Sequence, residues 1–213
     1  MVPSLKLTLP KIYPLTDVGL SGMTHAQQVA ALVEGGAELI QIREKAAASD
    51  EFFQAVKDCL AVAEKVGAKI IVNDRVDIAL AAGAHGVHLG QTDLPVVEAR
   101  KLLGVDAVIG ISTHSIVQAR AALEMPVDYI AFGPIWPTST KENPDPAVGL
   151  DLLSEVKRIA RVMPVVAIGG INESNRAATL AAGADSVAII SDLLMGPDAI
   201  ADRLRHLNTL AGV

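Results

Sequence analysis

One short segment carries an amide and two cations at alternate positions. Gln41, Arg43 and Lys45 follow an apolar run, and Ile42 and Glu44 stand between them. Residues two apart on a strand point to the same face, so the three polar side chains would project together. Arginine binds phosphate oxygens through paired hydrogen bonds, and lysine binds them as a point charge. The segment therefore predicts a phosphate or diphosphate site; the alternative is a solvated strand end on which Glu44 pairs locally.

Acidic residues follow the next two apolar runs. Asn73 and Asp74 end the run AKIIVND, and Asp93 ends VHLGQTD. Two carboxylates from neighbouring strands can hold Mg²⁺, which usually binds one or two carboxylates together with water and phosphate oxygens. A metal at this place would complete a diphosphate clamp. The alternative is that each aspartate caps a following helix, Asp93 at the start of a helix over 93–103.

The longest irregular stretch, FGPIWPTSTKENPDPAVG, contains hydroxyl and backbone donors beside a cation. Its prolines and glycines prevent regular structure, and a loop of this length in a compact domain is commonly functional. Thr138, Ser139 and Thr140, next to Lys141, suit an anion. The alternative is an exposed surface loop without a ligand.

The last two apolar runs end in AIGGI and AIIS. Gly169 and Gly170 would allow the backbone to approach a ligand closely, and barrel enzymes commonly bind phosphate in the loops after their last two strands. Gly170, Ile190 and Ser191 are therefore candidates for a second phosphate site. The alternative is that the glycines only form a tight turn.

Two histidines and a serine complete the set of reactive side chains. His88 is expected on a strand, where a lone histidine is more often a core residue with satisfied hydrogen bonds than a catalyst. Ser112 and His114, in ISTHS, are expected near the mouth of the site, with helix capping as the alternative.

Eight apolar runs of strand length position these residues, and helical patterns fall between them. Four of the runs follow small residues in a weak internal repeat: LVEGGAELIQIRE, ALAAGAHGVHLGQ, ALEMPVDYIAFGP and TLAAGADSVAIIS. The other four are KIYPLTD, AKIIVND, DAVIGIS and PVVAIGG. The helical patterns lie at about 24–35, 50–66, 75–82, 93–103, 115–124, 149–162, 173–182 and 197–208. Asp50, Ser115 and Asn172 or Glu173 mark helix starts.

Strict alternation of strand and helix predicts parallel strands with right-handed crossovers, and eight such units close naturally into a barrel. We therefore expect residues 1–213 to form a single (β/α)₈ TIM barrel domain of the α/β class. Its reacting groups should lie at the C-terminal ends of the strands. An open doubly wound sheet is the alternative, but no G-x-G-x-x-G follows the first strand and opens a helix.

Composition limits the remaining choices. Hydrophobic residues make up 51% of the 213 residues and aromatic ones only 3%, so aliphatic side chains must build the core. The net charge of −6, without a basic run, argues against a nucleic-acid surface. The N-terminus has no continuous apolar segment and no long uncharged apolar run occurs, so we expect a cytoplasmic, soluble protein without a membrane partner. The single Cys59 is expected to be a buried thiol.

Taken in order, QIREK, VNDR, GVHLGQTD, GISTHS, GPIWPTSTK, AIGGI and AIIS resemble the thiamine phosphate synthase family over nearly the whole chain. QIREK with VND and HLGQ-x-D is fairly specific and P-T-x-T-K adds to it, whereas AIGGI occurs in many phosphate-binding barrels. Trp136 stands where an aromatic such as Phe is usual, and ENPDPAVG departs from the family pattern.

The resemblance implies that a hydroxymethylpyrimidine diphosphate is joined to a thiazole phosphate, releasing diphosphate and giving thiamine monophosphate. It implies two phosphorylated small-molecule substrates and Mg²⁺ as cofactor. By similarity, the pyrimidine diphosphate would be bound by Gln41, Ile42, Arg43, Glu44, Lys45, Asn73, Ser112 and Lys141. The thiazole phosphate would be bound by Thr138, Ser139, Thr140, Gly170, Ile190 and Ser191, and Mg²⁺ by Asp74 and Asp93. Catalytic roles fall to Arg43, Lys45, Ser112 and Lys141.

Two alternatives stay open. A thiazole tautomerase shares much of this scaffold but would not need the diphosphate clamp, and a non-catalytic regulator of the thiamine pathway would bind a phosphate ester without turnover. A barrel of this size is compatible with a monomer or a homodimer.

Overall fold

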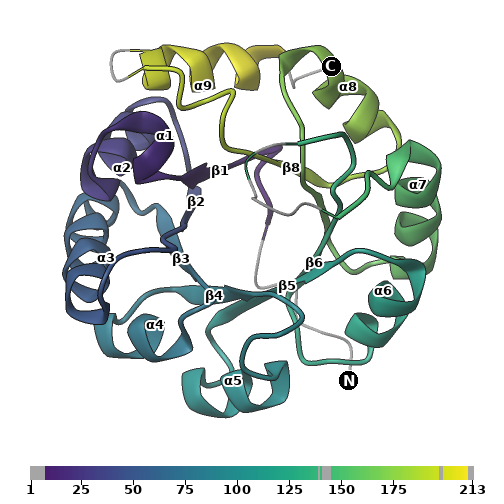
Figure 1. Ribbon diagram of the computed structural model, residues 1–213, viewed down its shortest axis with the longest axis horizontal. Helices are drawn as coiled ribbons and strands as arrows, with labels where there is room; N and C mark the ends of the chain where they lie inside the picture. Colours follow the sequence, from purple (N-terminus) through teal and green to yellow (C-terminus); the bar gives the residue numbers. More distant parts are fainter. Residues whose placement is uncertain (1–7, 139, 141–144, 197–198, 211–213) are drawn as a thin grey trace.

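Eight parallel strands close into a barrel in the computed structural model (Figure 1). The structure describes residues 8–138, 140, 145–196 and 199–210. The strands, in chain order around the barrel, are β1 (Ile12–Thr16), β2 (Leu39–Ile42), β3 (Lys69–Asn73), β4 (Gly86–Leu89), β5 (Val108–Thr113), β6 (Tyr129–Phe132), β7 (Val165–Ala167) and β8 (Ser186–Ile189). Parallel pairing of β1 with β8 closes the ring. The predicted (β/α)₈ architecture is confirmed for this part of the chain.

Helices form an outer ring around the strands (Figure 1). They are α1 (Val18–Ser21), α2 (His25–Glu34), α3 (Ser49–Ala63), the 3₁₀ turn η1 (Glu64–Val66), α4 (Val76–Ala82), α5 (Val96–Leu103), α6 (Ile116–Leu123), α7 (Gly149–Ala160), α8 (Glu173–Ala181) and α9 (Ile200–Leu210). Across the described ranges, no helix combines the length and the apolar character needed to cross a bilayer.

Helix starts agree with the sequence at some places and differ at others. The side chain of Ser115 caps α6 and that of Asn172 caps α8, as predicted. The predicted start at Asp93 is wrong, because α5 begins at Val96 after Pro95, a residue type suited to the entry of a helix. The short helix α1 was not predicted, since its four residues carry too little pattern.

Side chains alternate along each strand between two apolar layers. Residues such as Ile70 and Val72 on β3 point outward and pack under the helices, whereas Ile71 points into the barrel. Burial of an aliphatic side chain of this size contributes about 1.5–3 kcal/mol. The same alternation turns Gln41 inward and Ile42 outward on β2, where Ile42 is fully buried beneath the helices.

The N-terminal end of the barrel repeats one hydrogen bond at alternate strands. In each case the residue just before an even-numbered strand accepts the N–H of a residue at the start of the preceding strand. The pairs are His85 with Ile70 at 3.1 Å, Asp128 with Ile109 at 2.8 Å and Asp185 with Val165 at 2.8 Å. These acceptors lie in the small-residue segments of the sequence repeat, so the repeat corresponds to pairs of βα units.

Candidate active site

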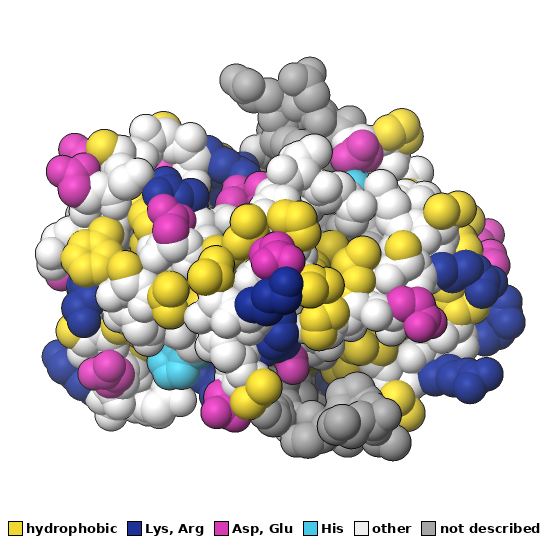
Figure 2. Space-filling view, turned by 90° about the horizontal axis from the view of Figure 1, so that it is seen from below, with side chains coloured by type: hydrophobic (Ala, Val, Ile, Leu, Met, Phe, Trp, Pro, Cys, Tyr) yellow, Lys and Arg dark blue, Asp and Glu magenta, His cyan; other side chains and the backbone are white. Residues whose placement is uncertain are grey.

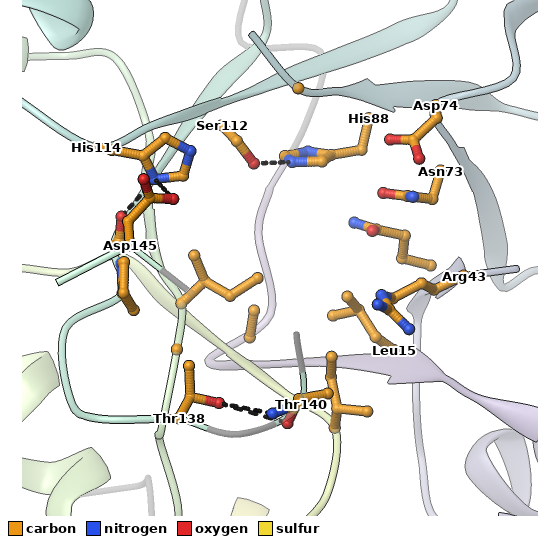
Figure 3. Close-up of a pocket in the computed structure, with 18 of the residues that line it drawn as sticks. Leu15, Arg43, Asn73, Asp74, His88, Ser112, His114, Thr138, Thr140 and Asp145 are labelled. Atoms are coloured by element: carbon orange, nitrogen blue, oxygen red, sulfur yellow. Dashed lines mark hydrogen bonds and ion pairs between the residues drawn. The ribbon is translucent and has the colours of Figure 1, made fainter. Parts of the chain in front are cut away.

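A cavity of about 560 Å³ opens at the C-terminal ends of the strands (Figure 3). It lies where barrel enzymes carry their reacting groups. The residues predicted from sequence that line it are Gln41, Arg43, Lys45, Asn73, Asp74, Asp93, Ser112, Thr138, Thr140, Gly170, Ile190 and Ser191. Residues separated by up to 150 positions in the chain thus meet around one space.

Two residues of the predicted set do not line the cavity, and two others are outside the described residues. The side chain of Ile42 belongs to the layer beneath the helices, and Glu44 does not line the cavity. Their assignment as substrate-binding side chains is therefore not supported by the geometry, because the strand alternation points them away from Gln41 and Arg43. Ser139 and Lys141 lie outside the described residues.

Glu44 instead organises the turn that follows β2. Its carboxylate accepts the N–H groups of Lys45 at 2.7 Å, Ala46 at 2.7 Å and Ala47 at 3.2 Å. It also contacts Nε2 of the buried His25 at 3.2 Å, and Nδ1 of that ring meets Thr16 at 2.8 Å. Burial raises the pKa of Glu44, but the N–H groups of Ala46 and Ala47 and the His25 contact outweigh it and lower that pKa overall. The predicted local pairing of Glu44 is thus present, and it holds the turn that carries Lys45.

The cations that line the cavity are compensated by carboxylates. Arg43 Nη1 forms an ion pair with Asp17 at 2.5 Å, and Lys45 Nζ donates to Asp74. The Arg43 side chain is 18% exposed, whereas that of Lys45 is 54% exposed and free to reorient in solvent. This wall thus carries one largely buried and one exposed cation, each paired with an aspartate.

Asp74 and Asp93 lie close together on the same side. Asp74 directly follows β3 with a φ of 63°, a left-handed conformation that aspartate tolerates better than most residues. Asp93 accepts the Gly90 N–H at 2.6 Å, which folds the turn after β4 back toward the cavity. Neither side chain is a helix cap, because α4 and α5 begin after Arg75 and Pro95. The capping alternative is therefore wrong for both.

This carboxylate pair suits a hard divalent cation. Burial raises the pKa of Asp93, and the neighbouring Asp74 carboxylate raises it further. Two acidic side chains in contact repel one another unless a cation or a proton lies between them. Mg²⁺ uses two carboxylates together with water and phosphate oxygens, so a third protein ligand is not required. Within the described ranges, no cluster of three or more Asp, Glu, His or Cys ligands occurs.

A hydrogen-bonded chain lies below and beside the cavity. Gln41 Nε2 donates to the Tyr13 hydroxyl at 3.3 Å, which meets the Tyr129 hydroxyl at 3.3 Å. His88 Nδ1 contacts the Tyr129 hydroxyl at 2.9 Å, and His88 Nε2 contacts the Ser112 hydroxyl at 2.8 Å (Figure 3). Burial lowers the pKa of His88 to about 4, so the ring is neutral near pH 7. His88 is thus a core residue with both ring nitrogens hydrogen-bonded, as expected from the sequence. It also lines the cavity.

Tyr13 and Tyr129 were missed from the sequence. Each stands inside an apolar strand, and their hydroxyls meet across the barrel although they are 116 positions apart. Gly110 makes room for this pair, because a Cβ there would lie 2.1 Å from the Tyr129 ring. A tyrosine on an inward-facing strand position is the signal that could have identified them, since a buried hydroxyl needs a partner.

The opposite wall consists of loops after β6, β7 and β8. Thr138 and Thr140 lie together there, and the Thr140 N–H donates to the Thr138 hydroxyl at 3.3 Å (Figure 3). Gly170 has a φ of 65°, and a Cβ at this position would lie 2.4 Å from the Pro137 carbonyl oxygen. Only glycine therefore allows the two loops to approach so closely.

His114 joins this wall to β5. Its Nδ1 donates to the Gly133 carbonyl at 2.6 Å, and the Asp145 carboxylate lies 3.8 Å away. Figure 3 shows the ring between Ser112 and Asp145 at the edge of the cavity. His114 accordingly fixes the start of the loop that carries Thr138 and Thr140, and the capping alternative belongs to Ser115 instead.

Fold and site together define a (β/α)₈-barrel protein whose cavity at the strand ends has the lining of an enzyme site for a small anionic molecule. A family model described as thiamine monophosphate synthase matches residues 12–193. The thiamine-phosphate synthase of Chloroflexus aurantiacus is 39% identical over 204 residues, covering 95% of this chain and 93% of that protein. The one from Methanocella arvoryzae is 42% identical over 191 residues, covering 89% and 90%.

A solved structure is similar to this chain in fold as well as in sequence. Thiamine phosphate pyrophosphorylase from Pyrococcus furiosus superimposes with a TM-score of 0.83 at 32% identity, covering 99% of this chain and 100% of that one. The chain belongs to the thiamine monophosphate synthase family, whose synthases are transferases. The resemblance seen in the sequence motifs is confirmed.

Proposed function

We propose that the protein condenses 4-amino-2-methyl-5-hydroxymethylpyrimidine diphosphate with 4-methyl-5-(2-phosphoethyl)thiazole. The products are thiamine monophosphate and diphosphate. The observation that carries the proposal is the division of one cavity into two unlike halves, with carboxylates and cations after β2 to β4 and hydroxyl and glycine loops after β6 to β8. The names of the relatives support the same reaction.

The half built on β2 to β4 suits the pyrimidine diphosphate. Arg43 and Lys45 supply positive charge, while the Gln41 and Asn73 amides can donate to and accept from an aminopyrimidine ring. Ser112, held by His88, adds a hydroxyl near the leaving group. Lys141, which lies outside the described residues, is assigned to the same half by the resemblance.

Asp74 and Asp93 are the residues that would hold Mg²⁺. Their contact and the raised pKa of Asp93 fit a site that is completed by a cation. The metal, when bound, supplies neutralising charge for the diphosphate. Lys45, which donates to Asp74, can turn from this carboxylate toward a phosphate oxygen because its side chain is half exposed.

The half built on the later loops suits the thiazole phosphate. Thr138 and Thr140 offer hydroxyl donors, and the backbone around Gly170, Ile190 and Ser191 offers N–H groups. Ser139 is assigned to this half by the resemblance alone. With both substrates present, the thiazole nitrogen would face the pyrimidine methylene carbon.

The proposed reaction breaks the bond between that methylene carbon and the diphosphate oxygen, which keeps the electron pair. The pyrimidine ring stabilises the resulting cation, and the thiazole nitrogen lone pair captures it to form the new C–N bond. The protein needs little acid or base chemistry for these steps. Its residues stabilise charge on the leaving group and align the two rings.

A coupled assay with both substrates, with and without Mg²⁺, tests the proposal. Thiamine monophosphate and diphosphate should form in equal amounts and only with the metal. Isomerisation of the thiazole phosphate without diphosphate release would instead identify a tautomerase. Binding of either phosphate ester with no turnover would identify a regulator, and each of these results would overturn the proposed synthase.

A further inference from the structure

Three segments of the chain meet beside the loop that follows β8. They are the start of α8 at Glu173, Asp192 directly after Ser191, and Arg203 on α9. None of these three side chains lines the cavity. Asp192, however, directly follows the cavity-lining Ser191, and Glu173 stands two residues after the cavity-lining Ile171.

Arg203 binds both of the other residues through separate nitrogens. Its Nη2 donates to Asp192 Oδ1 at 2.7 Å, and its Nε donates to the Asp192 carbonyl at 3.3 Å. Its Nη1 donates to Glu173 Oε2 at 2.5 Å. The second carboxylate oxygen of Asp192 accepts the Glu173 N–H at 3.0 Å, which closes the cluster. We call these three residues the Arg203 clamp.

The Arg203–Asp192 pair of the clamp is largely shielded from water, whereas the Glu173 side chain is 41% exposed. The Asp192 side chain is 12% exposed and the Arg203 side chain 24% exposed. Ion pairs of this kind are screened less by salt than surface pairs, and their planar, multiply bonded geometry fixes direction as well as distance. The backbone carbonyl of Asp192 is held together with its carboxylate, so the main chain itself is positioned.

The clamp ties together two of the three loops of the thiazole-phosphate half, those after β7 and β8. On one side it fixes Asp192, which follows the cavity-lining Ile190 and Ser191. On the other side it fixes Glu173 at the start of α8, and Asn175 of the same helix donates to the Gly170 carbonyl at 2.9 Å. Glycine and serine backbone groups that bind a phosphate must lie within a few tenths of an ångström of their productive positions.

We propose that Arg203 is a positioning residue for the thiazole phosphate, acting through Asp192 and Glu173 on the loops after β8 and β7. The inference rests on the proposed function, since it specifies which substrate the clamp serves. It assigns a role in substrate binding to a residue of α9 that touches no substrate. The pyrimidine half, built on β2 to β4, lies outside its reach.

The opposite end of the barrel offers a matched control. Arg100 there donates to the carbonyls of Pro126, Gly104 and Ala107 and to the Asp128 carboxylate at 2.6 Å. Asp128 in turn accepts the Ile109 N–H at 2.8 Å. Both clusters therefore join an arginine, an aspartate and a backbone N–H, but only one stands beside the cavity.

The experiment compares Arg203→Ala, Arg203→Lys and Arg100→Ala in the full chain with Mg²⁺. For Arg203→Ala, KM for the thiazole phosphate should rise at least about 10-fold, while KM for the pyrimidine diphosphate changes less than about 2-fold. Arg203→Lys keeps one charged contact and should give an intermediate rise. Arg100→Ala should lower Tm and leave both KM values unchanged.

Binding of the thiazole phosphate, measured by calorimetry without the second substrate, separates this inference from the proposed reaction. If the wild-type protein binds the ester but makes no thiamine monophosphate, the proposed function fails and the clamp is still tested. Equal affinity in wild type and Arg203→Ala overturns the inference. So does an equal rise in both KM values, or the same selective rise in Arg100→Ala. If Arg203→Ala does not fold, the Arg203→Lys values decide.

Discussion

Asp74 and Asp93 are held in contact although two like charges are more stable apart. The Gly90 N–H and the left-handed backbone of Asp74 keep both carboxylates at the cavity wall. Such a conflict between local stability and geometry is common where charge is arranged for a ligand. Removal of one of these carboxylates should therefore have opposite effects on stability and on activity.

Asp93→Asn should stabilise the metal-free protein and inactivate the enzyme. The amide removes the repulsion from Asp74, and its oxygen can still accept the Gly90 N–H. Tm without metal should rise by about 1–4 °C, and kcat should fall about 100-fold or more. Thermal melts with and without Mg²⁺ check the first part, since only the wild type should gain stability from the metal. An unchanged kcat would refute the metal role of Asp93.

His88 predicts a specific pH dependence of stability. Its folded pKa of about 4 lies below the ordinary value of 6.5, because burial disfavours the charged ring. Between these two values the unfolded chain binds a proton that the folded chain does not, so acid favours unfolding. The contribution is complete above pH 6.5 and is lost as the pH falls through 4; its size is on the order of 3 kcal/mol.

Urea unfolding of wild type and His88→Asn at pH 4.5, 5.5 and 7 measures this effect. The two proteins share all other titrating groups. The difference between them in how the free energy of unfolding changes with pH therefore reports on His88. The variant should lose less stability on acidification than the wild type. Parallel curves would show that the neutral ring at position 88 is not what acid destabilises.

Arg176 on α8 is a buried guanidinium with two donor atoms that find no partner among the described residues. It is 3% exposed, and within the described ranges its Nε and Nη1 atoms have no hydrogen-bond acceptor. An unsatisfied buried donor costs about 1–3 kcal/mol. Arg176→Met, which keeps an unbranched apolar stem and removes the donors, should raise Tm by about 2–6 °C in differential scanning calorimetry. A lower Tm would mean that Arg176 has an acceptor, such as ordered water, that the protein atoms do not provide.

At the scale of elements, the strand ends were predictable and the contacts between them were not. The alternation in residues 41–45 correctly placed Gln41, Arg43 and Lys45 on one face, because a strand has a fixed period of two. The same rule placed Glu44 away from the cavity, yet the resemblance had included it with the substrate ligands. The start of α5 was misplaced because the capping chemistry of Asp93 and the turn chemistry of Pro95 compete over three residues.

Contacts across the barrel depend on strand register, which no local pattern contains. The Tyr13 hydroxyl meets that of Tyr129 only because both strands are in place around Gly110. Arg203 similarly reaches Glu173 across 30 positions, through the packing of α9. Such long-range pairs explain why the sequence identified ligands at strand ends but not the residues that support them.

The hydrogen bonds at the start of alternate strands should contribute to the stability of the fold but not to substrate binding. Asp128→Ala removes the acceptor of the Ile109 N–H and the ion-pair partner of Arg100. The side chains of Asp128 and Arg100 are both half-buried. The loss should be about 1–3 kcal/mol, visible as a lower urea midpoint, with both KM values unchanged. Asp128→Asn keeps an acceptor for the N–H and should recover part of the loss. Equal midpoints for the two variants would show that the N–H bond contributes nothing.

At the scale of the whole molecule, acidic residues outnumber basic ones, 24 to 18. Figure 2 shows acidic, basic and hydrophobic side chains interspersed over the outer face that includes α5, without a continuous basic surface. This agrees with a net charge of −6 and with binding of small anions inside a cavity rather than a polyanion outside it.

One cavity with two unlike halves predicts sequential rather than ping-pong kinetics. In the proposed reaction a short-lived pyrimidine cation must meet the thiazole nitrogen before water reaches it, so both substrates have to be bound when the bond between the methylene carbon and the diphosphate oxygen breaks. Double-reciprocal plots for one substrate at several concentrations of the other should therefore intersect. Diphosphate release from the pyrimidine substrate alone should be at least about 100-fold slower than with the thiazole phosphate present. Parallel lines in these plots would contradict this prediction, and so would rapid diphosphate release without the second substrate. Either result would show that the reaction does not require both substrates to be bound together in the two halves of the cavity.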